Sequence, residues 1–286
     1  MNNLARLGDV KSDEVGVSGT SALDAVLDRG IEEVSREFES ETGCSFVARY
    51  GIRYLERQGR APFAELAIRE PLASISALVV DDDGDGDYEI TLVENTDYWV
   101  ERLNDLDTNT PIVMLRLNPD ATTIQITRWP TRRRGVKLTG LWGYSYELED
   151  TTLNTAEALD ASETDVTVDA AAATLIYQGD TVIVDSEQMA VTSVAGLVLS
   201  VVRGINGTTA ATHDTATSVY IRRYPRDVEE VVRERTVGKR WDSQGGYAGG
   251  ITLTGDPQGA AGRTEGRASF ARWARTIRRY KNWAVS

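Results

Sequence analysis

The sequence has one cysteine, one histidine and no long apolar run among its 286 residues. The single cysteine, Cys44, excludes an intramolecular disulfide framework and is expected to be a small buried side chain. The single histidine, His213, excludes multi-histidine metal sites and leaves one imidazole as a candidate catalytic base. No stretch approaches the ~18 apolar residues of a membrane span, and the N-terminus lacks the apolar core of a signal peptide. We therefore expect a soluble protein that is made in the cytoplasm of a cell and does not bind a membrane.

Basic side chains are outnumbered and unevenly distributed. The chain carries 44 acidic and 31 basic residues, a net charge of −13, and only four of the basic residues are lysines. Residues 1–225 carry a net charge of −18, whereas residues 226–286 carry +5. The acidic body argues against a nucleic-acid coat protein, which needs clustered Lys and Arg. The basic C-terminal end is typical of a segment that docks on a partner.

The first half of the chain predicts one helix followed by strands. Apolar residues recur every three or four positions between Ser21 and Ser40, with Ser21 and Asp24 resembling a capping box and Gly43 ending the helix. Beyond it, short apolar runs alternate with Asp, Asn, Gly and Pro clusters, which is typical of β-structure. The predicted strands are 52–55, 75–80, 88–93, 98–101, 113–117, 123–127 and 136–141.

The second half predicts a β module between two helical segments, so the fold class is α+β. Residues 151–224 have almost no helical pattern, and strands are predicted at 166–168, 181–184, 190–194, 197–202 and 219–223. A hairpin turn is expected at Ala195 and Gly196. Pro225 then fits the first position of a further helix.

The last predicted helix, about residues 265–283, is amphipathic and basic and follows a glycine-rich tether. Its apolar stripe has no obvious partner within the chain, so we expect the helix to dock on another protein. The expected docking residues are Phe270, Trp273, Arg275, Ile277, Arg278, Tyr280 and Trp283.

An acidic turn at residues 81–87 superficially matches an EF-hand loop. Asp81, Asp83 and Asp85 would take its first, third and fifth positions, but the twelfth position, which needs a bidentate glutamate, is Leu92. The flanks are also predicted strands, so an EF-hand is excluded. A solvated hairpin turn and a looser calcium site at the three aspartates stay open, and no cofactor is expected.

The other candidate sites all have simple structural interpretations. His213, with Asp214 beside it, lacks a nucleophile elbow, so a structural hydrogen bond is favoured over catalysis. Asp185 and Glu187 are either paired acid–base carboxylates or alternate residues on the polar face of a strand. No motif indicates an enzyme. A turn between two predicted strands contains Arg132, Arg133 and Arg134. This turn either contacts an acidic partner or a DNA phosphate, or is simply solvated.

Five short motifs follow the first helix in a characteristic order. They are Pro71, Leu72, Ser74 and Ile75; Asp97 and Tyr98; Trp129 and Pro130; Gly143 and Tyr144; and Pro225, Asp227 and Val228. In this order they resemble the head–tail connector (adaptor) proteins of tailed phages and tailed archaeal viruses, over about residues 18–147 and 224–244. The resemblance implies a helical-bundle connector core with β-hairpins at 1–147 plus 225–244. The β module at 151–224 is then an insertion, and residues 245–286 are a tether and docking helix.

The resemblance implies a structural protein of the virion neck. Family members form a ring, usually of twelve copies, that joins the portal protein to the stopper or tail-completion protein and extends the DNA channel. Viral DNA would pass through without sequence-specific binding, and the basic helix would dock on the portal. Another neck component, or a surface- or carbohydrate-binding β protein, stays open. Apart from Tyr224 at its end, the module has only Tyr177 and Tyr220 as aromatic residues, which argues against carbohydrate binding.

Overall fold

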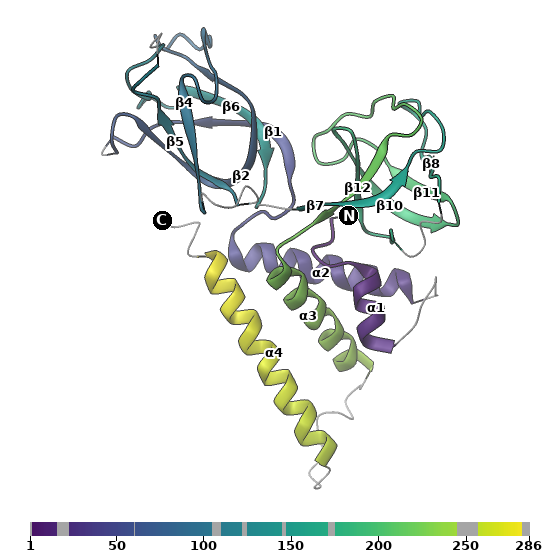
Figure 1. Cartoon of the computed structure of the whole chain (residues 1–286). Coiled ribbons are helices and arrows are strands. Elements are labelled where there is room, and N and C mark those ends of the chain that lie inside the picture. The colour runs from purple at the N-terminus through teal and green to yellow at the C-terminus, as the bar shows by residue number, and fades with distance from the viewer. Residues whose placement is uncertain are drawn as a thin grey trace. The chain divides into compact units, whose positions relative to one another are not determined.

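The computed structural model describes residues 2–15, 23–59, 61–104, 110–121, 125–144, 147–170, 175–244 and 257–281. It packs into two compact units, one of residues Cys44–Tyr146 and one of Met1–Gly43 with Glu147–Ser286 (Figure 1). Residues 44–146 are therefore in a different compact unit from the predicted helix at 21–40 and from residues 225–244. The connector core expected from the sequence grouped all of these segments together.

The unit of residues 44–146 is built on a six-stranded antiparallel sheet. The strands pair in the order β1-β6-β2-β5-β4, and β3 pairs with β2. Strand β2 is long, and it pairs with β5 through residues 65–72 and with β6 through residues 72–80. The strands are β1 (Arg49–Leu55), β2 (Glu65–Val80), β3 (Ile90–Leu92), β4 (Tyr98–Arg102), β5 (Ile112–Leu117) and β6 (Val136–Trp142).

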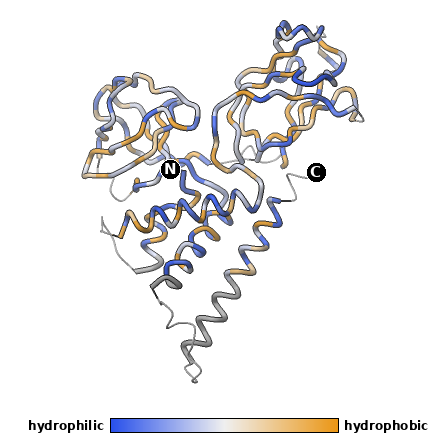
Figure 2. The backbone as a smooth tube through the Cα atoms, turned by 180° about the vertical axis from the view of Figure 1, so that it is seen from behind, coloured by the Kyte–Doolittle hydropathy of each residue, from blue (hydrophilic) through white to orange (hydrophobic). Residues whose placement is uncertain are grey.

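One face of this sheet forms a hydrophobic core, because hydrophobic and hydrophilic residues alternate along its strands (Figure 2). Trp129 is fully buried in this core, and its indole Nε1 donates to the carbonyl oxygen of Ala64 at 2.8 Å. Tyr98 is also buried. Both residues belong to the motifs noted in the sequence, so these motifs include major core residues of the unit.

The β module is a second six-stranded antiparallel sheet, ordered β7-β12-β9-β10-β11-β8. Its two outer strands also meet, since Thr155 pairs with Val168 and the Asp169 N–H donates to the Asn154 carbonyl at 3.0 Å. The sheet therefore closes on itself as a small barrel. The strands are β7 (Glu147–Asn154), β8 (Asp165–Thr167), β9 (Thr181–Val184), β10 (Glu187–Ala195), β11 (Val198–Val202) and β12 (Ser218–Arg223).

Four helices belong to the same unit as the barrel: α1 (Leu7–Val15), α2 (Asp24–Thr42), α3 (Arg226–Gln244) and α4 (Pro257–Lys281). Helices α2, α3 and α4 lie side by side, and α1 packs on α2 and α3 (Figure 1). Arg6, at the start of α1, forms a 3.1 Å ion pair with Asp180 of the barrel. Gly8 is required on α1, because a Cβ there would overlap the ring of Tyr177. None of the described helices is long and apolar enough to cross a membrane.

The predicted α+β class is confirmed, but the predicted helical-bundle core is wrong, because the protein is mostly β with two six-stranded sheets. The helix predicted from Ser21 to Ser40 corresponds to α2, and Gly43 ends it as predicted. Gly43 has a φ of 69°, and its N–H donates to the Glu39 carbonyl. Ser21, the predicted cap, lies outside the described residues. Residues 125–127 are not a strand, and 122–124 lie outside the described residues.

Candidate functional site

The predicted docking helix already has a partner within the chain. Trp273, Ile277 and Tyr280 of α4 are buried, with 5%, 8% and 4% of their surface exposed. The ring of Phe38 on α2 meets that of Trp273 edge-on at 5.2 Å and that of Tyr280 at 6.3 Å. These are favourable aromatic geometries. The expectation that this apolar stripe lacks a partner in the chain is therefore wrong for these three residues.

Polar contacts reinforce the docking of α4 on α2 and α3. The hydroxyl of Tyr280 donates to the carboxylate of Asp227 at 2.8 Å, and Arg272 pairs with Glu234 at 2.9 Å. The indole of Trp273 donates to Glu41 at 3.3 Å. The acidic residues of α2 and α3 thus neutralise part of the positive charge of α4. Such exposed pairs add little stability individually, so the buried aromatic rings dominate.

The remaining predicted docking residues differ in their surroundings. Phe270 is 60% exposed, with the guanidinium of Arg235 stacked 4.5 Å from its ring centre. Arg275 and Arg278 are exposed on the side of α4 that faces away from α2 and α3. Trp283 lies outside the described residues. A partner could therefore reach Phe270, Arg275 and Arg278 without unpacking the helix.

The three arginines of the 132–134 turn have separate environments. Arg132 donates to the Asp81 carbonyl and lies 3.4 Å from the Asp81 carboxylate. The guanidinium of Arg134 stacks 3.9 Å from the ring centre of Tyr54. Arg133 is exposed. Only Arg133 and Arg134 therefore face a surface that a ligand could contact.

Arg133 and Arg134 border a surface pocket of about 710 Å³ that the sequence did not reveal. Two further arginines from strands β1 and β2 line the same pocket, together with aromatic side chains. A single sequence offers no sign of this pocket, because its strands are brought together only by the bend and pairing of the sheet. The basic and aromatic lining residues are Arg53, Arg69, Arg133, Arg134, Tyr54 and Trp142.

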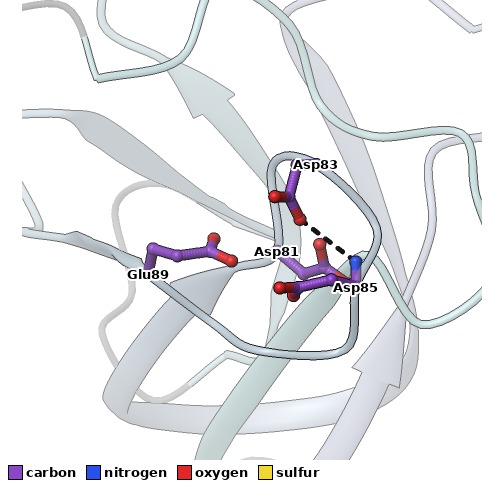
Figure 3. Close-up of side chains that lie close together, drawn as sticks. All are labelled: Asp81, Asp83, Asp85 and Glu89. Atoms are coloured by element: carbon purple, nitrogen blue, oxygen red, sulfur yellow. Dashed lines mark hydrogen bonds between the residues drawn. The ribbon is translucent and has the colours of Figure 1, made fainter.

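The acidic turn gathers the three predicted aspartates and adds a glutamate. The carboxylates of Asp81, Asp83, Asp85 and Glu89 each place an oxygen within 4.8 Å of the others (Figure 3). Asp81 is buried and accepts the N–H of Gly84 at 2.6 Å. It also accepts the N–H of Gly86 at 3.2 Å. Asp81 therefore stabilises the turn itself, and the charge of Arg132 beside it weakens any attraction for a cation.

His213 forms a buried network with two carboxylates of the barrel. Its Nδ1 lies 2.7 Å from Asp185 and its Nε2 lies 3.0 Å from Glu187. Glu187 in turn accepts two hydrogen bonds from Arg203, at 2.7 and 2.8 Å. The imidazole thus contacts Asp185 and Glu187, and not Asp214, which the sequence places beside it. Both nitrogens of the only imidazole are thus occupied by structural partners, which agrees with the structural interpretation of His213.

Glu187 is the centre of this network. Burial alone would raise the pKa of its carboxyl, but hydrogen bonds from Arg203, His213 and the N–H groups of Ala211 and Gly204 lower that pKa to about 2. The network ties the loop after β11 to the β9–β10 turn. We interpret it as a clamp that closes one end of the barrel.

The pH dependence of the clamp follows from the lowered pKa of Glu187. Its contribution to stability is complete above the ordinary value of 4.5 and is lost as the pH falls towards about 2. The difference in unfolding free energy between the wild type and Glu187→Gln should therefore shrink on acidification, by up to about 3 kcal/mol. Denaturant titrations of both proteins between about pH 7 and pH 2.5 measure this difference. A constant difference would show that the charge of Glu187 does not stabilise the barrel.

No protein-family model, curated protein or solved structure matches the chain. Cys44 is buried, as expected from the sequence. Within the parts of the chain that the structure describes, the exposed face of α4 and the arginine pocket of the 44–146 unit are the surfaces best suited to a partner.

Proposed function

We propose that this protein is a structural component of the neck of a tailed virus. Copies of the chain form a ring that joins the portal vertex to the stopper or tail and extends the DNA channel. The observation that carries this proposal is that the motifs resembling connector proteins, which are far apart in the sequence, meet in space. They meet in two places.

The first meeting place is in the 44–146 unit. Leu72 pairs with Trp142 and Ser74 with Leu141, so the "PLAS" segment lies beside "LWGY". The N–H of Gly143 donates to the Pro71 carbonyl at 2.8 Å. Gly143 has no room for a side chain, since a Cβ would lie 2.7 Å from the backbone of Ala48. The motifs therefore occupy positions that this sheet requires.

The second meeting place is between α2 and α3, which the 44–146 unit and the barrel together separate in the sequence. Helix α3 begins after Pro225, and its Val228, Val231 and Val232 are buried. Lys239 of α3 pairs with Glu33 at 2.7 Å and with Glu37 at 2.8 Å on α2. The N-terminal helix and the helix of the Pro225 motif thus pack together, although about 180 residues separate them in the sequence, and this contact supports the proposal.

Charge is consistent with a role in a DNA channel. A net charge of −13 gives a surface that repels DNA, so that DNA slides past it instead of binding. Arg275 and Arg278 on the exposed face of α4 are suited to a partner surface that is rich in carboxylates. We assign that carboxylate-rich surface to the portal protein. Arg275 and Arg278 would then contact the portal, and the apolar stripe of α4, which packs within the chain, would not.

The direct test is the mass of the full chain in solution, alone and with purified portal rings. We expect a multiple of the 31.4 kDa chain mass, and a complex with the portal ring in light scattering and electron microscopy. A protein that stays monomeric at all accessible concentrations and does not bind the portal ring would contradict the proposal.

Reversing charge on the exposed face of α4 should weaken portal binding without unfolding the helix. Arg275→Glu with Arg278→Glu is expected to reduce affinity at least about tenfold, because each guanidinium would lose a carboxylate partner. The matched control is Arg29→Glu with Arg226→Glu, which changes the net charge equally at exposed positions of α2 and α3. Biolayer interferometry on immobilised portal rings measures both. Equal weakening by the two double variants would remove α4 from the interface.

A further inference from the structure

The arginine pocket of the 44–146 unit has the dimensions of a ligand site. Its volume of about 710 Å³ falls within the range of ~300–1,000 Å³ typical of such sites. It lies between β1 and the first half of β2, and the side chains of Arg53 and Glu70 span it through a 2.9 Å ion pair. Trp142 forms part of the lining, with the guanidinium of Arg53 stacked 5.3 Å from its ring centre.

The lining is basic in an acidic protein. Four arginines line the pocket against two glutamates, Glu56 and Glu70. Arg69 and Arg133 are exposed, and Arg134 is held in place by its contact with Tyr54. Guanidinium groups ordered by aromatic faces bind carboxylates with defined geometry. The pocket therefore favours an anionic ligand.

One wall of the pocket is the edge of a sheet. Among the described residues β1 pairs only with β6, so its other edge is available to a further strand. Tyr50, Ile52 and Tyr54 alternate along β1 with 43%, 45% and 42% of their surface exposed. An extended peptide beside β1 would gain backbone hydrogen bonds and would cover these side chains.

We infer that this pocket binds an extended, acidic peptide segment of a partner protein, which lies along β1 and places its carboxylates on Arg53, Arg69, Arg133 and Arg134. The inference concerns the 44–146 unit alone and does not depend on ring formation or on the portal contact of α4. It adds a second, separate docking site to the protein.

The chemistry of the pocket favours a peptide over a nucleic acid. Glu56 and Glu70 can accept hydrogen bonds from the backbone N–H groups of a peptide, whereas they repel the phosphate groups of a nucleic-acid strand. The adjacent acidic turn contains four exposed aspartates, Asp82, Asp83, Asp85 and Asp87. Tyr88, which follows this turn, donates to the Arg134 carbonyl at 2.8 Å. A uniformly charged polyanion would be repelled by these carboxylates.

The test uses the full chain and a fluorescein-labelled peptide of about ten residues that alternates glutamate with valine. Fluorescence polarisation should show saturable binding that weakens as salt is raised. Arg133→Glu should reduce the affinity at least about tenfold, and Arg69→Glu should do the same. The matched control is Arg128→Glu, an exposed arginine of the same unit outside the pocket lining, which should change affinity less than about twofold.

The position of the bound peptide provides a second readout. A version of the peptide that carries a photoreactive benzoylphenylalanine should crosslink to residues 53–58 and 67–70, as located by mass spectrometry. An oligothymidylate of about ten nucleotides is the competing probe. The inference is overturned if the peptide does not bind, if Arg128→Glu weakens binding as much as Arg133→Glu, or if the oligonucleotide binds more tightly than the peptide and displaces it.

Discussion

Trp273→Ala is expected to lower the free energy that holds α4 on the rest of its unit by about 3–5 kcal/mol, the usual cost of removing a large buried aromatic side chain. Trp273 is 5% exposed and meets Phe38 at 5.2 Å. Its removal leaves a cavity beside Phe38 and deprives Glu41 of a hydrogen bond. Hydrogen exchange of peptides covering residues 269–281 measures the effect as faster exchange in the variant.

Phe270→Ala is the matched control for this prediction. It removes an aromatic ring from the same helix, but Phe270 is 60% exposed, so the cost should stay below about 1 kcal/mol. If the two variants accelerate exchange of α4 equally, the packing of Trp273 does not hold the helix. The same two variants also test portal binding. Trp273 is buried and cannot contact the portal, so Trp273→Ala should weaken portal binding only by releasing α4 from α2 and α3.

Glu187→Ala is expected to destabilise the barrel by about 3–5 kcal/mol, because it leaves Arg203 buried without its carboxylate and leaves His213 with only that of Asp185. The side chains of Arg203 and Glu187 are only 5% and 1% exposed. The N–H groups of Gly204 and Ala211 would also lose their acceptor. Denaturant unfolding of the full chain, with hydrogen exchange of residues 180–215, locates the loss in the barrel.

Asp185→Ala is the control for the clamp. Asp185 contacts the other nitrogen of His213 at 2.7 Å, but its side chain is 59% exposed. Water can replace the lost carboxylate, so the cost should be about 1 kcal/mol or less. A loss as large as that of Glu187→Ala would mean that His213, and not Glu187, is the centre of the network.

Much of the β-structure was predictable because alternation and turn residues are local signals. The strand Thr181–Val184 was predicted with the observed bounds. A hairpin joins β10 to β11 as expected, but its turn lies at Gly196 and Leu197, one residue later than predicted, because Ala195 pairs with Val198. Strand β7 was missed because its sequence, ELEDTTLN, is mostly polar. It is held by pairing with β12, a partner about 70 residues later, which no local pattern reveals.

The candidate sites were less predictable, because they depend on which segments meet. The sequence singled out Arg132, Arg133 and Arg134 but not Arg53 and Arg69, which join them only through the pairing of the sheet. It identified His213 and Glu187 separately, without the contact between them. Glu89 joins the acidic turn because β3 folds back on β2.

The sequence by itself determined the α+β class, the scarcity of histidine and cysteine, and the division into an acidic body and a basic end. These properties depend on composition and on short-range periodicity, which folding does not change. Only the tertiary structure decided that the basic helix α4 packs Trp273, Ile277 and Tyr280 on α2 and α3, so that its exposed surface includes Arg275, Arg278 and Phe270. An amphipathic helix buries its apolar stripe wherever a complementary surface lies within reach, and only the folded chain shows that this surface is its own.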